Sequence, residues 1–274
     1  MKKILVVLGL LVICFLSFFI WWQNGLQAVN VSNKTPQIFV IKKGEGVREI
    51  ATNLTHGTLD IWTTIPEGLR ATEIAAILKA KIPSYNASWV STLQANEGYL
   101  FPDTYLIPRD ADINMILALL KNNFQQKFDS VKNSKTTVLT DAQTIIIASI
   151  IEREAVFPAD RPLVASVLIN RLNIGMALGS DPTVMYALGY QADTKTWWKK
   201  DLTVDDLAID SPYNTRKNAG LPPTPISNPG LLSIKAALNP SKTDYLYYFS
   251  DKQGHLHFAT TIEGHNANIQ KYGE

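Results

Sequence analysis

The sequence predicts an α+β protein with a single transmembrane helix at its amino terminus. Three observations support this fold class: a long apolar run near the start, helix-type periodicity through the centre, and strand-type alternation near the end. The 274 residues are 46% hydrophobic, which is enough to form a buried core, so disorder is not expected. The formal net charge of +2 is too small, and its lysines and arginines too dispersed, to indicate nucleic-acid binding.

The apolar run covers residues 4–22, which are 19 residues without a charge. A helix of that length can cross a hydrocarbon core of about 30 Å. Two lysines precede the run and residues 23–33 carry no charge, so the positive-inside rule predicts a cytoplasmic amino terminus and an extracytoplasmic remainder. One alternative is a cleaved signal peptide, with Leu26-Gln27-Ala28 as a weak cleavage site. Cys14, in the middle of the run, disfavours a lipoprotein.

A short repeat follows at an offset of 24 residues. The segments IKKGEGVREIATNL and IPEGLRATEIAAIL, which begin at Ile41 and Ile65, align in their glycine, glutamate and apolar positions. Each copy predicts a short strand, a turn containing glycine and an amphipathic helix. Two interpretations remain open. The units either stabilise each other as generic strand-turn-helix pairs, or form a carbohydrate-binding module that resembles LysM, which binds amino-sugar polymers.

The stretch LTDAQTIIIASIIEREAV predicts a mostly buried helix with a defined start. Thr140 is expected as the N-cap, and Gln143 three residues later completes a capping box. Helical spacing places Glu152 on a stripe of apolar and small residues, whereas Glu154 points about 200° away. Apolar surroundings disfavour an ionised carboxylate, which favours Glu152 as a general acid. The alternative is that both glutamates belong to the solvated end of a buried helix.

Further helices and rigid loops follow. A helix is expected to begin near Asp160 with Pro162 in its first turn, and another to open at Asn228-Pro229. Between them, a short helix is expected with Asp181 as its N-cap, Pro182 at its start and Gly189 at its end. The intervening loops SPYNT and GLPPTPISNPG are suited to the walls of a sugar groove, because proline fixes the backbone at little ordering cost. They are equally suited to plain connections.

The carboxyl-terminal part predicts a hairpin and a last helix. DYLYYFS and HLHFATT alternate as strands, DKQG joins them, and the helix follows near EGHNANIQKY. His255 and His257 would share one strand face with His265 nearby, but no further ligand is spaced convincingly, so we expect no metal and no cofactor. The sequence also lacks a phosphate-binding GxxxxGK[ST] loop, a GxSxG elbow and a cysteine nucleophile outside the apolar run.

Six blocks carry a family resemblance and cover most of the chain in order. They are TIPEG (64–68), EGYLFPDTY (97–105), ASIIEREA (148–155), SVLINRLNIGMALGSDPTVMYALG (166–189), PYNTRKNAGLPPTPISNPG (212–230) and the hairpin ending HFATT. Together they resemble the endolytic murein transglycosylase family, also called MltG or YceG-like. The resemblance implies a small LysM-like subdomain followed by a mixed α+β catalytic domain.

The implied organisation has four parts. Residues 1–23 form the cytoplasmic tip and transmembrane helix, 24–36 a linker, 37–82 the LysM-like repeat and 83–274 the catalytic domain. One departure from the family concerns the connection between the two repeat copies, which is short here. This shortening indicates a reduced LysM-like part and leaves its glycan binding open.

The resemblance also implies a reaction and its residues. The essential glutamate of the family lies in the block ASIIEREA, which carries over to Glu152 as the catalytic residue. It would protonate the glycosidic oxygen between N-acetylmuramic acid and N-acetylglucosamine and then deprotonate the C6 hydroxyl, closing a 1,6-anhydro ring. Candidates for binding the strand are polar members of the blocks: Glu97, Asn170, Asp181, Thr183, Tyr213, Asn214 and Thr215.

The implied partners are peptidoglycan glycan strands and, through residues 4–22, the bacterial inner membrane. An enzyme that cuts nascent strands there would terminate glycan elongation beside the peptidoglycan synthases. Two other functions remain open. One is a hydrolytic muramidase in which Glu97 or Asp181 activates water, and the other is a non-catalytic, membrane-anchored peptidoglycan-binding protein.

Overall fold

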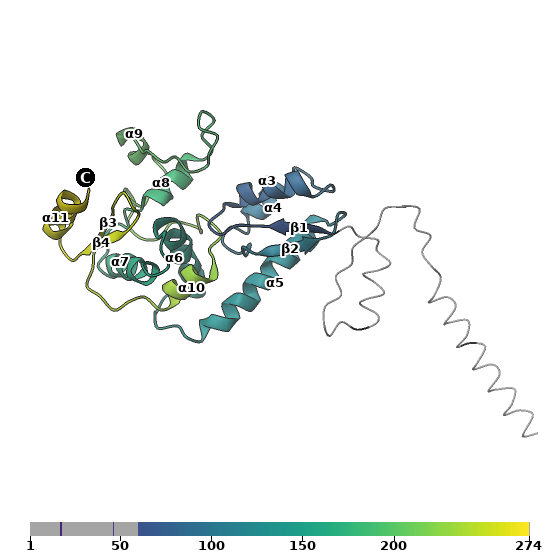
Figure 1. Ribbon diagram of the computed structural model, residues 1–274, viewed down its shortest axis with the longest axis horizontal. Helices are drawn as coiled ribbons and strands as arrows, with labels where there is room; N and C mark the ends of the chain where they lie inside the picture. Colours follow the sequence, from purple (N-terminus) through teal and green to yellow (C-terminus); the bar gives the residue numbers. More distant parts are fainter. Residues whose placement is uncertain (1–16, 18–45, 47–59, 274) are drawn as a thin grey trace, which may run out of the picture. The chain divides into compact units, whose positions relative to one another are not determined.

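The computed structural model describes residues 17, 46 and 60–273, which form a mixed α+β structure (Figure 1). The predicted transmembrane helix and the first repeat copy lie outside the described residues, apart from Ser17 and Gly46. Within the described part of the chain, no helix is long and apolar enough to cross a membrane.

The first group of elements, here called the small lobe, consists of a two-stranded sheet and two helices. Their bounds are β1 (Ile61–Thr64), α3 (Ala71–Lys81), α4 (Trp89–Gln94) and β2 (Thr104–Ile107). The strands β1 and β2 pair antiparallel, with Ile61 opposite Ile107. The second repeat copy therefore forms the predicted strand, glycine turn and helix, with Gly68 at a φ of 76°. Its likeness to LysM stays a prediction.

The helix α5 (Ile113–Lys132) connects two hydrophobic clusters. Near its start, Ile116 and Leu120 are buried with the residues of the small lobe. Two turns later, Phe124 and Phe128 are buried with the elements that follow, here called the large lobe. One long amphipathic helix thus contributes to both clusters, and the domain boundary expected at residue 83 stays a prediction.

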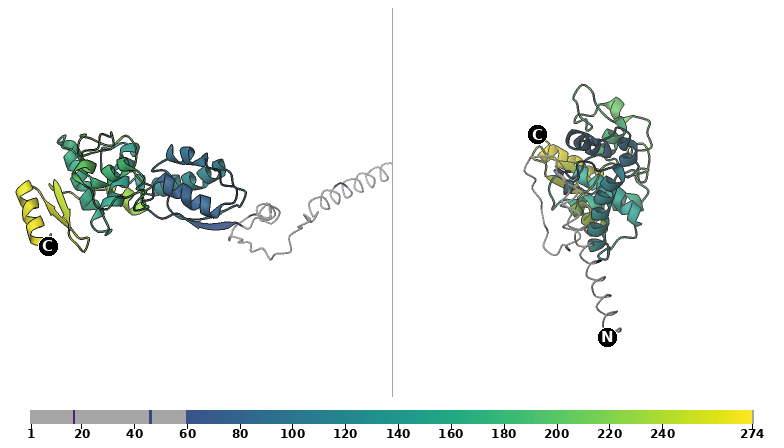
Figure 2. Two further views of the ribbon diagram at one scale, coloured as in Figure 1. Left: turned by 90° about the horizontal axis from the view of Figure 1, so that it is seen from above. Right: turned by 90° about the vertical axis from the view of Figure 1, so that its right-hand side faces the viewer.

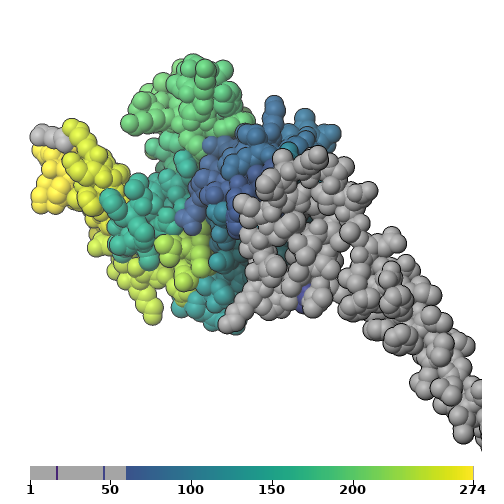
Figure 3. Space-filling model, turned by 45° about the vertical axis from the view of Figure 1, so that its right-hand side comes forward, coloured from purple at the N-terminus to yellow at the C-terminus, as the bar shows by residue number. Residues whose placement is uncertain are grey.

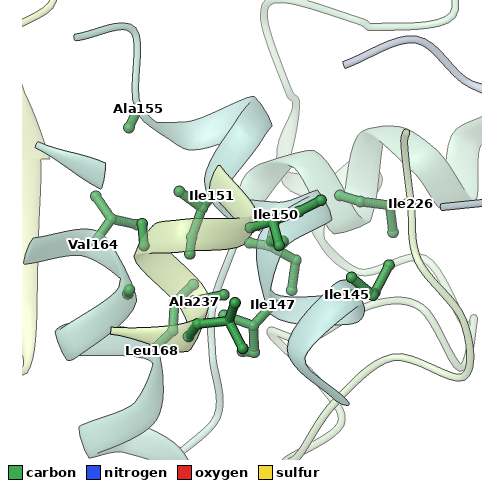
Figure 4. Packing of buried hydrophobic residues seen from close by; sticks show 14 of the residues in the cluster. Ile145, Ile147, Ile150, Ile151, Ala155, Val164, Leu168, Ile226 and Ala237 are labelled. Carbon is green, nitrogen blue, oxygen red and sulfur yellow. The ribbon is translucent and has the colours of Figure 1, made fainter. Parts of the chain in front are cut away.

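The centre of the large lobe is formed by three helices: α6 (Asp141–Glu154), α7 (Arg161–Asn173) and α10 (Leu231–Leu238). Buried isoleucines of α6 pack against α7 and α10 (Figure 4). The start of α6 is the predicted capping box, in which the Thr140 hydroxyl accepts from the Gln143 N–H at 3.2 Å and the Gln143 side chain accepts from the Thr140 N–H at 2.8 Å. The apolar spacing and the cap together fix where this helix begins and which face it buries.

Two helix starts differ from the expectation. The N-cap of α8 (Asp181–Leu188) is Ser180 rather than Asp181, because the Asp181 carboxylate pairs with Arg216 at 2.6 Å. The helix α10 begins after Gly230 rather than at Asn228-Pro229, because the backbone of Asn228 is held in a pair of hydrogen bonds with residues 68–69. After α8, a segment with the short helix α9 (Val204–Leu207) stands out from the surface in green (Figure 3).

The predicted carboxyl-terminal hairpin and helix are confirmed. The strands β3 (Tyr247–Ser250) and β4 (Leu256–Ala259) pair antiparallel, and α11 (Ile262–Tyr272) packs on both. Within residues 60–273, this unit lies at the end opposite to the small lobe (Figure 2). The last turn of α6, where Glu152 lies, contacts the small lobe, because Arg153 donates to the Gly68 carbonyl at 3.5 Å.

Candidate active site

Glu152 lies in the last turn of α6, where the starts of two other helices meet it. Its side chain is 5% exposed, and one carboxylate oxygen accepts from Arg161 Nη2 at 3.1 Å. The other oxygen accepts from the backbone N–H of Gly230, at the start of α10, at 2.9 Å. The face of α6 that carries Glu152 is apolar, as predicted. The carboxyl group itself does not have the apolar surroundings that were expected, because Arg161 and Gly230, which are distant in sequence, donate hydrogen bonds to it.

A second carboxyl group reaches this site from the small lobe. Glu67, in the turn after β1, has a half-exposed side chain, and its Oε2 lies 3.9 Å from Arg161 Nη1. The side chain passes so close to Gly230 that a Cβ atom there would lie 1.9 Å from Glu67 Oε1. Partial burial and the neighbouring Glu152 raise the pKa of Glu67, whereas Arg161 lowers it. The site therefore contains two carboxyl groups that interact with one arginine.

The Arg161 side chain is buried at the first residue of α7, and some of its N–H donors make no hydrogen bond within residues 60–273. Among the described residues, neither its Nε nor its Nη1 finds a hydrogen-bond partner. A buried donor without a partner costs about 1–3 kcal/mol, so such a group in a folded protein points to a functional role or to a bound water or ion. The guanidinium donates through Nη2 to Glu152, while its Nη1 lies 3.9 Å from Glu67.

Cationic and aromatic side chains extend the site along the small lobe. The Arg153 guanidinium stacks on the Trp198 ring at 3.9 Å, and Arg70 stacks on Tyr186 at 4.0 Å. Burial lowers the pKa of both arginines, while nearby glutamates, Glu73 among them, oppose this shift. A pocket of about 210 Å³ opens beside them, lined by Arg70, Thr72, Gln94, Glu97, Tyr186, Gly189 and Trp197. Planar rings and fixed polar groups of this kind can accommodate sugar residues.

Glu97, a predicted strand-binding residue, lines that pocket but is 5% exposed. Its carboxylate accepts from the Ala71 N–H at 2.9 and 3.1 Å and from Asn228 Nδ2 at 2.7 Å. Burial raises the pKa of Glu97 to about 7, although these hydrogen bonds oppose the shift. The structure thus uses Glu97 to hold the start of α3, and its role toward glycan stays a prediction.

Asn170 and Asp181 are placed in separate parts of the large lobe. Asn170, on α7, donates through Nδ2 to the carbonyls of Thr243 at 2.8 Å and Tyr245 at 3.0 Å. Asp181, on α8, forms its ion pair with Arg216 at the surface. In this structure, both side chains interact with other parts of the protein, and their predicted contacts with glycan stay predictions.

The other four candidates come together around the loop that follows α9. The hydroxyls of Thr183 and Thr215 are buried and lie 2.8 Å apart. Asn214 is also buried and donates to the carbonyls of Leu207, at the end of α9, and of Ile209. The Tyr213 ring lies 4.8 Å from the ring of Tyr186, which borders the pocket. Of these four, Tyr213 is therefore the residue that packs against the pocket lining, and all four roles stay predictions.

Glu154 occupies the opposite face of α6, as its helical spacing predicts. The carboxylate is buried and accepts from the Ser180 hydroxyl at 2.5 Å. Burial raises the pKa of Glu154, and the hydrogen bond from Ser180 opposes this shift. Its contacts are with the start of α8 rather than with Arg161, so it is not part of the two-carboxyl site.

The three histidines considered for zinc do not converge. The His257 ring stacks on Tyr272 and lies 2.9 Å from Asp251, while His255 stacks on Phe157. His265 packs against Tyr247. In residues 60–273, no group of three or more histidine, cysteine, aspartate or glutamate side chains is arranged to hold a metal ion.

Sequence reasoning did not identify Glu67, Arg161 or Gly230 as members of the site. Two signals were present. Glu67 belongs to the block TIPEG, and Arg161 occupies the first position of a helix, where a cation opposes the helix dipole. Such a position suggests that the arginine has another partner. Gly230 likewise ends the block 212–230, but nothing local to the sequence shows that its N–H meets Glu152 or that Glu67 passes close to it.

The comparison with protein families decides which group of proteins has this arrangement. The model of the YceG-like family matches residues 18–271, which is nearly the whole sequence. The chain belongs to the YceG-like family. A crystal structure of a YceG-like protein from Listeria monocytogenes is similar, with a TM-score of 0.64 and 34% identity over 80% of each chain.

Two curated relatives are similar over the same share of this YceG-like chain. The endolytic murein transglycosylase of Bacillus subtilis is 43% identical over 182 residues, which is 64% of this chain and 48% of the relative. The endolytic murein transglycosylase of Streptococcus pneumoniae strain D39 is 35% identical over 181 residues, 64% of this chain and 32% of the relative. The chain thus spans about half and about a third of the length of these relatives.

Proposed function

We propose that this chain is an endolytic lytic transglycosylase that cuts peptidoglycan strands between N-acetylmuramic acid and N-acetylglucosamine. The observation that carries the proposal is the placement of Glu152, at the end of a buried helix and held by Arg161 and the Gly230 N–H. Residues distant in sequence converge on this one carboxyl, as preorganised catalytic groups do. The names of the Bacillus and Streptococcus relatives support the same activity.

The proposed mechanism uses one carboxyl group twice. Protonated Glu152 donates its proton to the glycosidic oxygen, the bond from that oxygen to C1 of the muramic residue breaks, and positive charge develops at C1. The ionised Glu152 then accepts the proton of the C6 hydroxyl while that oxygen bonds to C1. The products are a free hydroxyl and a 1,6-anhydro end. No water is consumed, and Glu152 regains its proton.

The two donors that hold Glu152 support this sequence of steps. After the first proton transfer, the carboxylate of Glu152 accepts from Arg161 Nη2 and from the Gly230 N–H, as in the present structure, and both donors stabilise its negative charge. Orientation by fixed donors of this kind lowers the barrier because it requires no reorganisation during the reaction.

The contacts of Glu97 and Asp181 give the hydrolytic alternative little support. The Glu97 carboxylate is bonded to Ala71 and Asn228, and Asp181 Oδ1 is paired with Arg216. Among the contacts of the described residues, neither carboxyl touches Glu152 or Arg161. Glu67 is the carboxyl that a hydrolase would have to use, and the product analysis below separates that case from the lytic one.

We also propose that the enzyme works at the inner bacterial membrane. The apolar run 4–22 would anchor the chain, with its amino terminus in the cytoplasm and the catalytic part outside. Residues 23–35 can span at most about 40 Å when extended, so cleavage would occur close to the bilayer. This position favours nascent strands as substrates and peptidoglycan synthases as neighbours. The strand-turn-helix repeat would hold the glycan as a LysM-like module.

The test is product analysis with the full chain and purified peptidoglycan strands. Fragments are examined by mass spectrometry for the native protein, for Glu152→Gln, and for Glu263→Gln as a matched control on the exposed face of α11. We expect 1,6-anhydro ends from the native protein and the control, and at least a hundredfold fewer from Glu152→Gln. Circular dichroism verifies that each variant is folded.

Two other results would overturn the proposal. Reducing ends in place of anhydro ends would identify a hydrolytic muramidase. Intact strands that nevertheless sediment with the folded protein would identify a non-catalytic peptidoglycan-binding protein.

A further inference from the structure

The guanidinium of Arg161 lies between two carboxyl groups that approach it from different lobes. Its Nη2 is 3.1 Å from an oxygen of Glu152, and its Nη1 is 3.9 Å from an oxygen of Glu67. We propose that Glu67 is a positioning residue of the active site. It forms an ion pair with Arg161 whenever Glu152 is protonated, and this allows Glu152 to act as the acid. This inference rests on the proposed function of Glu152.

Charge balance is the first argument. Arg161 with an ionised Glu152 alone is already neutral, so adding a proton to Glu152 would leave an uncompensated, largely buried cation. With Glu67 included, two ionised carboxylates and one arginine carry one net negative charge, and one added proton makes the group neutral. Glu67 therefore supplies the charge that allows Glu152 to be protonated beside an arginine.

Geometry is the second argument. Arg161 Nη1, which faces Glu67, is a buried donor without a hydrogen bond, although a carboxylate oxygen lies just beyond hydrogen-bond distance. A displacement of less than about 1 Å would bring the two within the usual 2.7–3.2 Å. The absence of a side chain at Gly230 lets Glu67 pass at this distance, since a Cβ atom would overlap it. Arg161 can thus move between the carboxyls without leaving its buried position.

The surroundings contain a further cation near Glu152. Arg153, next to Glu152 on α6, stacks on Trp198; burial lowers its pKa, and Glu73 and then Glu152 oppose this shift. The Glu73 carboxylate accepts from Trp198 Nε1 at 3.0 Å. Burial and the neighbouring Glu152 raise the pKa of Glu67, as expected for two carboxyl groups close enough to interact. Arg161, on α7, is the cation that contacts both carboxyls directly.

Arg161 changes its carboxylate partner as the proton moves during the reaction. Before cleavage, Glu152 carries the proton and Arg161 is paired with Glu67. When Glu152 has given its proton to the glycosidic oxygen, Arg161 returns to the new carboxylate, as in the present structure. When the C6 hydroxyl gives its proton back to Glu152, Arg161 pairs with Glu67 again. Glu67 itself neither gains nor loses a proton.

The first test is the pH dependence of strand cleavage by the full chain. The initial rate of anhydro-end formation is measured from pH 5 to pH 8 for the native protein, Glu67→Gln, Glu67→Asp and the control Glu263→Gln. In Glu67→Gln, Glu152 loses the neighbouring negative charge and is harder to protonate. We expect its rate at pH 8, relative to pH 5, to fall on the order of tenfold further than that of the native protein. Glu67→Asp, which keeps the charge, should recover part of the loss.

Equal loss at all pH values would overturn the inference and leave Glu67 with a structural role. An unchanged profile would overturn it as well. The proposed function fails separately, if Glu152→Gln still forms anhydro ends or if the native protein forms none.

The second test does not depend on activity. The full chain is labelled with glutamate that carries ¹³C at the side-chain carboxyl, and the Glu152 signal is identified by its absence in Glu152→Gln. We expect this signal to titrate at lower pH in Glu67→Gln than in the native protein. If the Glu152 signal titrated identically in Glu67→Gln and in the native protein, the inference would be contradicted, whether or not the protein cleaves strands.

Discussion

Glu97 is the single residue whose ionisation should affect stability most clearly. Its carboxyl is buried, and its pKa is raised from 4.5 to about 7. In the unfolded chain the group is ionised above its ordinary pKa, whereas in the folded protein it stays protonated until about pH 7. The folded state therefore binds more protons in this interval, and the free energy of unfolding must fall as the pH rises through it.

We expect this loss to amount to about 3 kcal/mol between pH 4.5 and pH 7, because one pKa unit corresponds to about 1.4 kcal/mol. Urea denaturation followed by tryptophan fluorescence at several pH values measures it. In Glu97→Gln the same interval should show a smaller slope, since the titrating group is removed. An identical slope in both proteins would mean that Glu97 is ionised throughout the interval.

Gly230 provides a second prediction at the residue scale. Its φ of −77° is accessible to alanine, but a Cβ atom would overlap the end of the flexible Glu67 side chain. We expect Gly230→Ala to unfold with a free energy within about 1 kcal/mol of the native value, and to form anhydro ends at least tenfold more slowly, because Glu67 is displaced. The control is Gly264→Ala, where the added atom meets ordinary contacts. Full activity in Gly230→Ala would show that the close packing of Glu67 is unimportant.

At the scale of elements, Asn228 joins the two lobes. Its Oδ1 accepts from the N–H groups of Gly98 at 2.9 Å and Leu100 at 3.0 Å, and its Nδ2 donates to Leu69 and to Glu97. The side chain is fully buried, so its removal leaves several buried polar groups without partners. The loop before α10 is thus attached to the turn after β1 and to the loop before β2.

We expect Asn228→Ala to lower the free energy of unfolding by at least about 3 kcal/mol, measured by urea denaturation. The control is Asn218→Ala, in the same loop but exposed, which should cost less than about 1 kcal/mol. A small effect in Asn228→Ala would show that water replaces the side chain and that the lobes are joined by other contacts.

The elements that the sequence predicted are those with local signals. The capping box at Thr140 and the apolar spacing of α6 are both local, and the hairpin follows from alternation and a turn. The errors at the starts of α8 and α10 arise because distant groups bind the residues that were expected to begin each helix. Arg216 pairs with the Asp181 side chain, and residues 68–69 form hydrogen bonds with the backbone of Asn228. Apolar residues also recur along α5 at helical spacing, a local signal that predicts this helix although none was expected there.

At the scale of the whole molecule, the site depends on contacts that no local pattern contains. Glu152 could be singled out because it ends a buried helix and lies in a family block. Its partners Glu67, Arg161 and Gly230 come from a turn and two helix starts far apart in the sequence. The strand-binding candidates were chosen for polarity, and several are buried in hydrogen bonds within the protein, which polarity alone does not reveal.

The membrane anchor is a prediction about the whole chain. We expect the full chain, expressed in bacteria, to sediment with membranes and to stay there after high-salt washing, because 19 uncharged residues favour insertion. A version without residues 4–22 should appear in the soluble fraction. Release of the full chain by salt would indicate electrostatic binding at the surface, and a soluble full chain would contradict the anchor.

The central claim, that cleavage is lytic and consumes no water, is tested most directly in ¹⁸O-labelled water. Purified peptidoglycan strands are incubated with the full chain in this solvent, and the new ends are examined by mass spectrometry. The mechanism predicts 1,6-anhydro ends without ¹⁸O, because the C6 oxygen of the sugar itself bonds to C1. Reducing ends that carry ¹⁸O at C1 would show that water attacks, and would contradict the account of Glu152 as the acid and base of a lytic transglycosylase.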